Sequence, residues 1–168
     1  MPTARFVADA MLGRLARWLR VLGFDTVYDP PMHDTELVAL ASSEQRILLT
    51  RDRHLLRELR PQHALEIRTD APLQQLRDVI EALDLIAPAE LFTRCLVCNT
   101  PLSDVGDAEI EALVPPATRE LPGPIRRCPN CARVYWPGSH VRRMRRALEG
   151  ALPGWLDHTD GRGAPEAL

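Results

Sequence analysis

Apolar residues in the first half of the chain follow two alternating spacings. Short apolar runs, typical of buried strands, occupy residues 4–9, 26–29, 47–50 and 64–68. Apolar residues spaced three or four apart, as on one face of a helix, fill residues 10–24, 34–45, 53–59 and 71–86. This order predicts an α/β fold in which a parallel sheet is sandwiched by helices with right-handed crossovers.

Local signals mark the ends of these helices. The first helix carries Arg14, Arg17 and Arg20 on its polar side, and Gly23 is a plausible C-terminal stop. Asp34 is the expected N-cap of the second helix. The pattern therefore predicts surface arginines along the first helix.

The second half of the chain differs in composition. After a linker at 87–94 come two cysteine pairs, a proline-rich middle and a basic end. Ser139 can cap a final helix that ends at Gly150. We predict three parts: a first domain at 1–90, a second at 91–150 that ends in the basic helix, and a flexible tail at 151–168.

Acidic residues stand where strands end or the following helices begin. Asp9 ends the first strand, Asp52 follows the third, and Asp34 starts the helix after the second, with Glu36 two residues further on. In a parallel sheet these positions share one edge, where ligands bind. Converging carboxylates repel one another, and a hard cation such as Mg²⁺ or Mn²⁺ removes that penalty. Such an ion can activate water for phosphodiester cleavage.

The same acids also fit roles that need no metal ion. Asp34 and Asp52, taken singly, match helix caps, each contributing about 1 kcal/mol. A phosphoacceptor receiver domain also uses strand-end acids, but it normally needs a lysine, and all 21 positive charges here are arginine. A phosphatase with a D-x-D nucleophile is disfavoured because Met11 stands two residues after Asp9. The lack of lysine also excludes Schiff-base and Walker-A chemistry.

The four cysteines form two C-x-x-C pairs, Cys95 with Cys98 and Cys128 with Cys131. Two such knuckles can complete a closed, tetrahedral, structural zinc site. The segment between the pairs is longer than in common zinc ribbons, so residues 103–125 are expected to be an insertion. Four unpaired core thiols or a redox pair would leave the doubled spacing unexplained.

The segment 126–150 is rich in arginine and has no acid before Glu149. Arginines and aromatics together suit phosphate contacts and base stacking. The alternative is a solvated helix face, with the aromatics and His140 packing the small zinc module. The candidate nucleic-acid-binding residues are Arg126, Arg127, Arg133, Tyr135, Trp136, His140, Arg142 and Arg143.

No run of the chain approaches the roughly 20 apolar residues that span a bilayer. The first ten residues lack the basic-then-apolar layout of a signal peptide. A cytoplasmic location without a membrane partner is therefore expected, and this setting favours zinc over disulfides for the cysteines.

Three segments resemble the Mut-seven C-terminal RNase domain family of PIN-like proteins: FVADAMLGRLARWLRVLGFDT at 6–26, DTELVALA at 34–41 and ILLTRD at 47–52. The segments 94–102 and 126–144 resemble the zinc ribbon that follows in that family. The resemblance implies a PIN-like fold and metal-dependent ribonuclease activity. It places Asp9, Asp34 and Asp52 at the acidic motif positions and Arg14 at a basic one, while Thr50 and Arg51 complete a Thr-Arg-Asp motif. Asp70 is a candidate for a fourth acid.

Two functions remain open from the sequence. The first is a Mg²⁺- or Mn²⁺-dependent ribonuclease that acts through the strand-end aspartates, with a zinc ribbon that helps to bind RNA. The second is a non-catalytic RNA-binding or adaptor protein whose acidic pocket is vestigial. Arg51 separates the two, because it would hold phosphate in the nuclease and neutralise the pocket in the binder. A homodimer is compatible with either.

Overall fold

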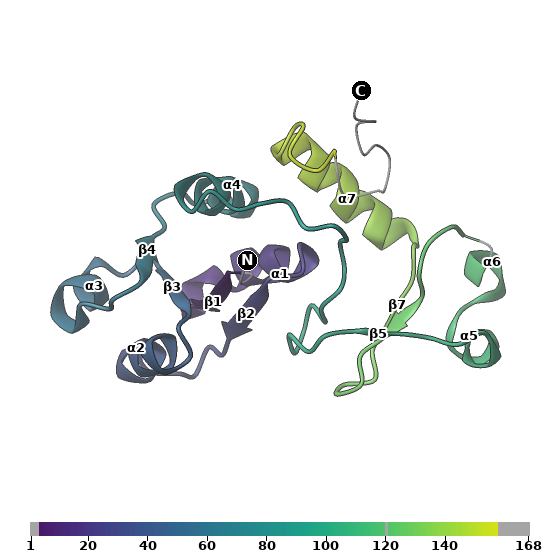
Figure 1. Ribbon diagram of the computed structural model, residues 1–168, viewed down its shortest axis with the longest axis horizontal. Helices are drawn as coiled ribbons and strands as arrows, with labels where there is room; N and C mark the ends of the chain where they lie inside the picture. Colours follow the sequence, from purple (N-terminus) through teal and green to yellow (C-terminus); the bar gives the residue numbers. More distant parts are fainter. Residues whose placement is uncertain (1–3, 120, 158–168) are drawn as a thin grey trace, which may run out of the picture.

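The computed structural model describes residues 4–119 and 121–157 (Figure 1). Its first half is a four-stranded parallel sheet with the order β2-β1-β3-β4. The strands are β1 (Arg5–Ala8), β2 (Asp25–Tyr28), β3 (Ile47–Thr50) and β4 (Ala64–Glu66). The helices are a short 3₁₀ turn, η1 (Ala10–Leu12), followed by α1 (Gly13–Val21), α2 (Asp34–Ser43), α3 (Arg53–Leu59) and α4 (Pro72–Ala82). The predicted α/β fold is confirmed, and we call residues 4–86 the sheet module.

Alternate residues of the strands face two separate cores. Phe6 and Ala8 of β1 point to the side covered by α1 and α4. Val7 and Leu48 point to the opposite side, which α2 and α3 cover. Figure 1 shows α4 and α2 on opposite sides of the sheet. Both faces of the two central strands are buried, which agrees with the apolar runs FVA of β1 and ILL of β3.

The second half, residues 87–157, contains a small antiparallel sheet of β5 (Ser103–Asp104), β6 (Arg126–Arg127) and β7 (Val134–Tyr135). The segment expected to be an insertion lies between the two cysteine pairs and carries β5 together with α5 (Asp107–Leu113) and α6 (Pro116–Arg119). The basic end forms α7 (Ser139–Ala151). We call this half the cysteine module.

The structure corrects two of the predicted helix ends and agrees with a third. The N-cap of α2 is His33, so Asp34 is the first helical residue and not the cap. Gly138, and not Ser139, occupies the N-cap of α7, which continues through Gly150 to Ala151. Gly23 does terminate α1: it has φ +83, and its N–H donates to the Arg20 carbonyl at 3.0 Å.

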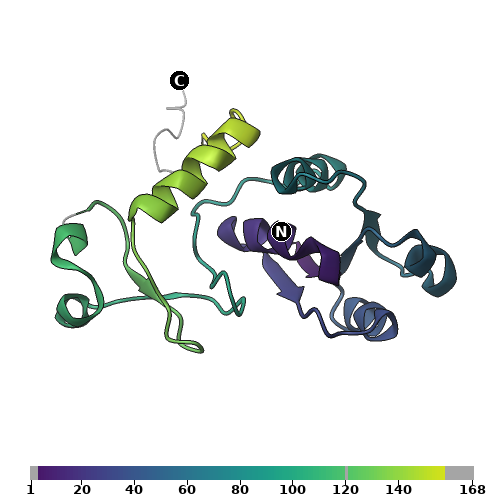
Figure 2. The same cartoon turned by 180° about the vertical axis from the view of Figure 1, so that it is seen from behind.

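The apolar face of α7 packs onto the sheet module. Met144 and Leu148 are buried in the same core as α1 and α4, and both ribbon views place α7 beside these elements (Figure 1, Figure 2). Beyond the helix Leu156 is buried, and the Trp155 indole donates to the Leu85 carbonyl at 3.1 Å. The expected flexible tail therefore does not begin at residue 151, because residues 152–157 pack on the core. Residues 158–168 lie outside the described part.

The first cysteine loop is anchored to α1 and β2. Arg20 was expected on the polar side of α1, but it is only 4% exposed because the loop covers it. Its guanidinium donates to the carbonyls of Leu96 at 3.1 Å and Val97 at 2.9 Å. Asn99 accepts from the Thr26 N–H at 3.0 Å and donates to Asp25 at 2.7 Å. Hydrogen bonds thus fix how the two modules meet.

Asp25 is the acidic centre of this junction. Its carboxylate accepts from the buried Arg46 at 2.8 Å and from Arg5 at 3.3 Å. Burial alone would raise the pKa of Asp25, but hydrogen bonds from Arg46 and Asn99 outweigh burial and lower the pKa to about 2. The folded state therefore favours the ionised carboxylate.

Replacing Asp25 by Asn should destabilise the protein near neutral pH by about 1 to 2 kcal/mol, after allowance for solvent screening. The unfolded chain binds the proton first as pH falls, because its pKa is near 3.8 and the folded pKa is about 2. The stabilisation is therefore complete above about pH 4 and lost as pH falls towards 2. Urea unfolding at several pH values measures it. Glu81→Gln, on the exposed face of α4, is the control, and equal stability of Asp25→Asn and wild type above pH 4 would contradict the assignment.

Candidate active site and metal centre

Asp9 leaves β1 at the carboxyl edge of the sheet and is 8% exposed. It occupies the N-cap position of η1, yet its side chain makes no capping hydrogen bond. The carboxylate instead accepts a hydrogen bond from the Thr50 hydroxyl, at 2.8 Å from Oδ2. Helix capping therefore does not explain why an acid stands at this position.

Thr50 connects the ends of the two central strands. The parallel register pairs Ala8 with Leu49, so Asp9 and Thr50 leave neighbouring strands side by side. The fully buried Thr50 hydroxyl donates to Asp9 and accepts from the Asp52 N–H at 2.9 Å. One hydroxyl thus orients the Asp9 side chain and the backbone that carries Asp52.

Asp52 does cap a helix, as the sequence suggests for an acid in its place. Its Oδ1 accepts from the N–H groups of His54 at 2.7 Å and Leu55 at 3.2 Å, at the start of α3. Within the described residues, its other oxygen, Oδ2, makes no hydrogen bond. Capping and ligand binding are therefore compatible, since each can use a different oxygen.

The free oxygen of Asp9 also faces outwards. Oδ1 has no hydrogen-bond partner among the described residues. No buried side-chain oxygen in that part of the chain lacks a partner, so this atom reaches solvent. An accessible carboxylate oxygen on a fixed side chain fits a hard cation such as Mg²⁺, which binds through one or two carboxylates and keeps several waters.

Asp34 and Glu36 are both exposed at the start of α2. Glu36 folds back on its own helix, where Oε2 accepts from the His33 N–H at 2.8 Å. In the described part of the chain, the four cysteines are the one set of three or more potential ligands whose ligand atoms all lie within 4.8 Å of one another. The strand-end acids therefore form no closed cage of that size.

Arg51 pairs with an acid outside the set formed by Asp9, Asp34 and Asp52. It donates to the Asp70 carboxylate, the candidate fourth acid, which is 88% exposed. No ion pair links Arg51 to Asp9 or Asp52 in the described residues. Arg14 lies exposed in the first turn of α1 and makes no hydrogen bond or ion pair with any residue that the structure describes. The acidic edge is therefore not neutralised by either arginine.

Two neighbours of this edge were missed from the sequence. The Tyr28 hydroxyl donates to the Ala10 carbonyl at 3.0 Å, and a Cβ on Gly13 would lie 2.6 Å from that hydroxyl oxygen. Glycine at the start of α1 thus leaves room for Tyr28 to hold the turn after Asp9. The sequence feature that could have indicated this contact is a glycine within a helical pattern. Asp29 directly follows β2 and lies level with Asp9, which follows the adjacent strand. Its position after an apolar run could have identified it as a further strand-end acid.

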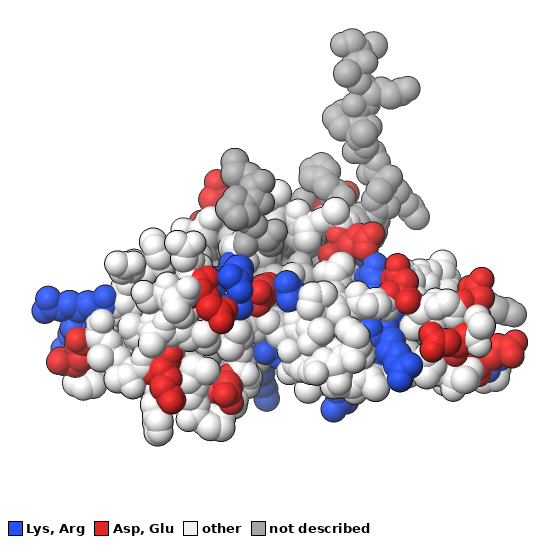
Figure 3. Space-filling model, turned by 60° about the horizontal axis from the view of Figure 1, so that its bottom comes forward, with Lys and Arg blue, Asp and Glu red and all other residues white. Residues whose placement is uncertain are grey.

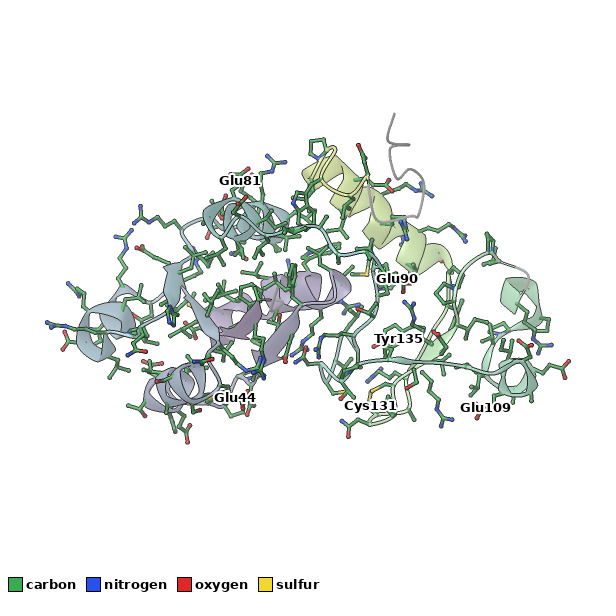
Figure 4. All side chains as sticks on the ribbon, viewed as in Figure 1. Glu44, Glu81, Glu90, Glu109, Cys131 and Tyr135 are labelled. Atoms are coloured by element: carbon green, nitrogen blue, oxygen red, sulfur yellow. The ribbon has the colours of Figure 1, made fainter. Side chains whose placement is uncertain are left out.

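The four cysteines come together as the spacing predicts. Cys95 and Cys131 have their sulfurs 3.5 Å apart, and those of Cys98 and Cys128 are 3.4 Å apart. Tetrahedral zinc with bonds of about 2.3 Å needs sulfurs separated by roughly 3.8 Å. In Figure 4 the sulfur atoms gather beside Cys131. The residues present therefore fit a structural Zn²⁺.

The two cysteine loops repeat one backbone conformation. In each, the residue after the second cysteine is left-handed: Asn99 has φ 66 and Ala132 has φ 60. Its N–H donates to the first cysteine's carbonyl, at 3.0 Å in one loop and 2.9 Å in the other. This repeat aims both thiols of each loop at the same point, as zinc knuckles do.

Hydrogen bonds around the sulfurs favour thiolate at one of them. Burial alone would raise the pKa of Cys98, but hydrogen bonds from the Thr100 side chain and backbone outweigh it and lower the pKa to about 5. Tyr135 supports Cys95: its hydroxyl lies 3.2 Å from the Cys95 sulfur and accepts from the Leu96 N–H at 3.0 Å. Burial, followed by the Cys95 hydrogen bond, raises the pKa of Tyr135.

The candidate RNA-binding residues divide into two groups. Arg126 is engaged inside the protein, where it pairs with Glu90 and Asp104 and donates to two backbone carbonyls. Arg127 lies within 3.8 Å of Glu109, and Trp136 lies against Gly138. The surface group has exposed side chains at Arg133, His140, Arg142 and Arg143. On the face shown in Figure 3, arginines and acids are interspersed, so cationic sites have to be found locally.

The structure thus contains two candidate sites: a strand-end aspartate that does not act as a helix cap, and a four-cysteine centre. A comparison with protein families matches the part of the chain that holds both. A family described as the Mut7-C RNAse domain matches residues 4–148. The chain belongs to the Mut7-C RNAse domain family. The match covers both modules, so the Mut7-C family unit includes the cysteine centre as well as the sheet. No curated protein and no solved structure matches the chain. No helix among the described residues is long and apolar enough to cross a membrane.

The geometry of the four cysteines predicts that the protein binds zinc. Purified protein should contain about one zinc per chain, and Cys128→Ala should lose it. Losing the site should lower the thermal midpoint by about 10 °C or more, because several kcal/mol of metal-linked folding free energy are removed. Elemental analysis and calorimetry measure both effects. Ser103→Ala, at an exposed position of β5, is the control; zinc-free protein with an unchanged midpoint would contradict the prediction.

Proposed function

We propose that this protein hydrolyses phosphodiester bonds of RNA with Mg²⁺ or Mn²⁺ held at the carboxyl edge of its parallel sheet. The observation that carries the proposal is the state of Asp9: buried, held by Thr50, free of any capping role, and with one oxygen open to solvent. Membership of an RNase domain family supports RNA as the substrate.

In this proposal the metal is held directly by Asp9 Oδ1 and Asp52 Oδ2, the two oxygens that have no hydrogen bond among the described residues. Asp34 and Glu36, from the start of α2, act through metal-bound water, which suits their exposure. A bound Mg²⁺ or Mn²⁺ would lower the pKa of a water molecule and stabilise the charge on the phosphate. Thr50 fixes the first carboxylate, and the α3 N-terminus fixes the second.

The arginines supply phosphate contacts. Arg14 extends from the first turn of α1 without a described partner and can donate to a non-bridging phosphate oxygen. Arg51 is bound to Asp70, an exposed acid, and such surface pairs contribute about 1 kcal/mol or less. Substrate phosphate can therefore replace Asp70 as its partner. An arginine paired with Asp9 would instead have supported the non-catalytic alternative.

The proposed role of Zn²⁺ is structural, through Cys95, Cys98, Cys128 and Cys131. Arg126 and Tyr135 stabilise the cysteine module through the contacts described above, and the proposal does not assign them to RNA. The exposed Arg133, His140, Arg142 and Arg143 supply the RNA contacts of this module. The proposal places the enzyme in the cytoplasm, where RNA is abundant.

Asp9→Asn should abolish Mn²⁺-dependent cleavage of single-stranded RNA, lowering the rate by about 100-fold or more, because a neutral amide is a poor ligand for a hard cation. The fold should persist, since Thr50 can still donate to the amide oxygen. Gel-based cleavage assays with purified protein measure the loss. The matched control is Asp107→Asn in the exposed first turn of α5. Cleavage by Asp9→Asn at the wild-type rate would refute the assignment. If the wild-type protein binds RNA in a salt-sensitive way but does not cleave it, the non-catalytic RNA-binding alternative is favoured.

Thr50→Val tests the proposed positioning role. Valine keeps the shape but removes the hydrogen bonds to Asp9 and Asp52, so the Mn²⁺ concentration for half-maximal activity should rise about 10- to 100-fold. Thr50→Ser keeps the hydroxyl and should restore the wild-type metal dependence. A purely structural role would lower the stability of Thr50→Val and leave the metal dependence of the folded fraction unchanged.

A further inference from the structure

A groove of about 340 Å³ lies between α1 and the cysteine module. Its basic side chains come from three parts of the chain: Arg17 of α1, Arg133 before β7 and His140 of α7. Its apolar surface includes Leu96, Val97 and Val141. Its volume falls within the range of small-ligand sites. We call it the junction groove.

The junction groove has an uncompensated positive character. None of its described lining residues carries a carboxylate. Arg17 Nη2 lies 3.2 Å from His140 Nε2, and this is the one described hydrogen-bond partner of the Arg17 side chain. The Arg133 guanidinium has no described partner. Several guanidinium N–H groups are therefore available to an anion.

Arg133 is also held in place by the metal centre. Its carbonyl accepts from the Cys128 N–H at 2.8 Å, as part of the second cysteine loop. Arg17 belongs to the helix on which the first loop is anchored. The backbone positions of the cations on the two sides of the groove are therefore set by the same junction, and their guanidinium groups can both reach a phosphate between them.

Helix α1 connects this groove to the proposed active site. It follows Asp9 after the short η1 turn and is terminated at Gly23, whose carbonyl accepts from Arg94 of the cysteine module at 3.1 Å. Arg14 and Arg17 lie on the same exposed face, about 4.5 Å apart along the axis. Positive side chains thus lead from the carboxyl edge of the sheet into the groove.

We propose that the junction groove binds one nucleotide of single-stranded RNA beyond the scissile bond. Arg17 and Arg133 donate to the phosphate, while His140 Nε2 accepts from Arg17 and orients it. The unstacked base lies on the apolar surface that includes Val97, which is 52% exposed. A duplex could not place a single base there. The inference rests on the proposed function only in taking RNA as the ligand.

The test measures binding of a short fluorescein-labelled oligouridylate by anisotropy, using zinc-loaded full-length protein without added Mg²⁺ or Mn²⁺. Arg17→Ala and Arg133→Ala should each weaken binding roughly fivefold to tenfold and reduce the slope of log K against log salt by about 0.7, the value for one single-strand phosphate contact. Arg17→Lys should retain part of the affinity. Arg57→Ala, exposed on α3, is the matched control and should bind like wild type.

Unchanged affinity and salt slope in both alanine variants would overturn the proposal. If the binding of a duplex RNA is weakened equally by Arg17→Ala, the proposal that the groove takes single-stranded RNA is wrong. Asp9→Asn separates the two hypotheses, because it should stop cleavage and leave this binding intact. If wild-type protein binds RNA through the junction groove but never cleaves it, the proposed ribonuclease activity is refuted and the proposed binding in the groove is supported.

Discussion

The relative placement of the two modules depends on one buried cation, Arg20. Its guanidinium is shielded from water and donates to the Thr26 carbonyl at 3.0 Å as well as to two carbonyls of the first cysteine loop. Burial lowers the pKa of Arg20, while the neighbouring Cys95, Cys98 and Asp25 raise it. A guanidinium stays protonated in proteins, so a buried one needs acceptors for its N–H groups. The cysteine loop supplies two of them, the carbonyls of Leu96 and Val97, and moving the loop would take these acceptors away from a buried charge.

The same charge complements the metal centre. Four thiolates around one Zn²⁺ carry a net charge of about −2, and a buried anion needs nearby positive charge. Arg20 provides it from the last turn of α1, where the helix dipole also favours a cation. Arg20 therefore links the carbonyls of the cysteine loop to α1. Helix α1 follows Asp9 after the short η1 turn, so the helix that carries Arg20 also borders the proposed active site.

The sequence predicted those features that depend on residues close together along the chain. Apolar runs located all four strands of the sheet module, and the cysteine spacing located the metal centre, because both depend on near neighbours along the chain. Contacts between distant segments were harder. Arg20 was placed on the polar side of α1 since nothing in its own helix indicates the loop that covers it. Arg126 and Tyr135 resembled an RNA-binding surface, but their partners Glu90 and Cys95 are more than 30 residues away.

At the acidic edge, the type of residue could be predicted but its role could not. Asp34 and Asp52 matched the capping pattern, while Asp9 was recognised only as an acid that ends a strand. Whether an acid caps a helix depends on backbone geometry that a sequence does not show. The structure separates them: Asp52 caps α3, Asp34 is preceded by the true cap His33, and Asp9 bonds to a threonine from another strand. Only the parallel register, which places Asp9 beside Thr50, distinguishes the last case.

A boundary near residue 90 separates two kinds of sequence but not two cores. Met144 and Leu148 of α7 are buried among residues of α1 and α4, and Arg77 of α4 donates to the Ala151 carbonyl at the end of α7. Cutting there would expose apolar surface on both pieces and leave Arg20 without its acceptors at Leu96 and Val97. The family match runs from 4 to 148 and so covers both kinds of sequence. The shared core holds the proposed catalytic edge and the cations of the cysteine module in one frame, as the proposed RNA path along α1 requires.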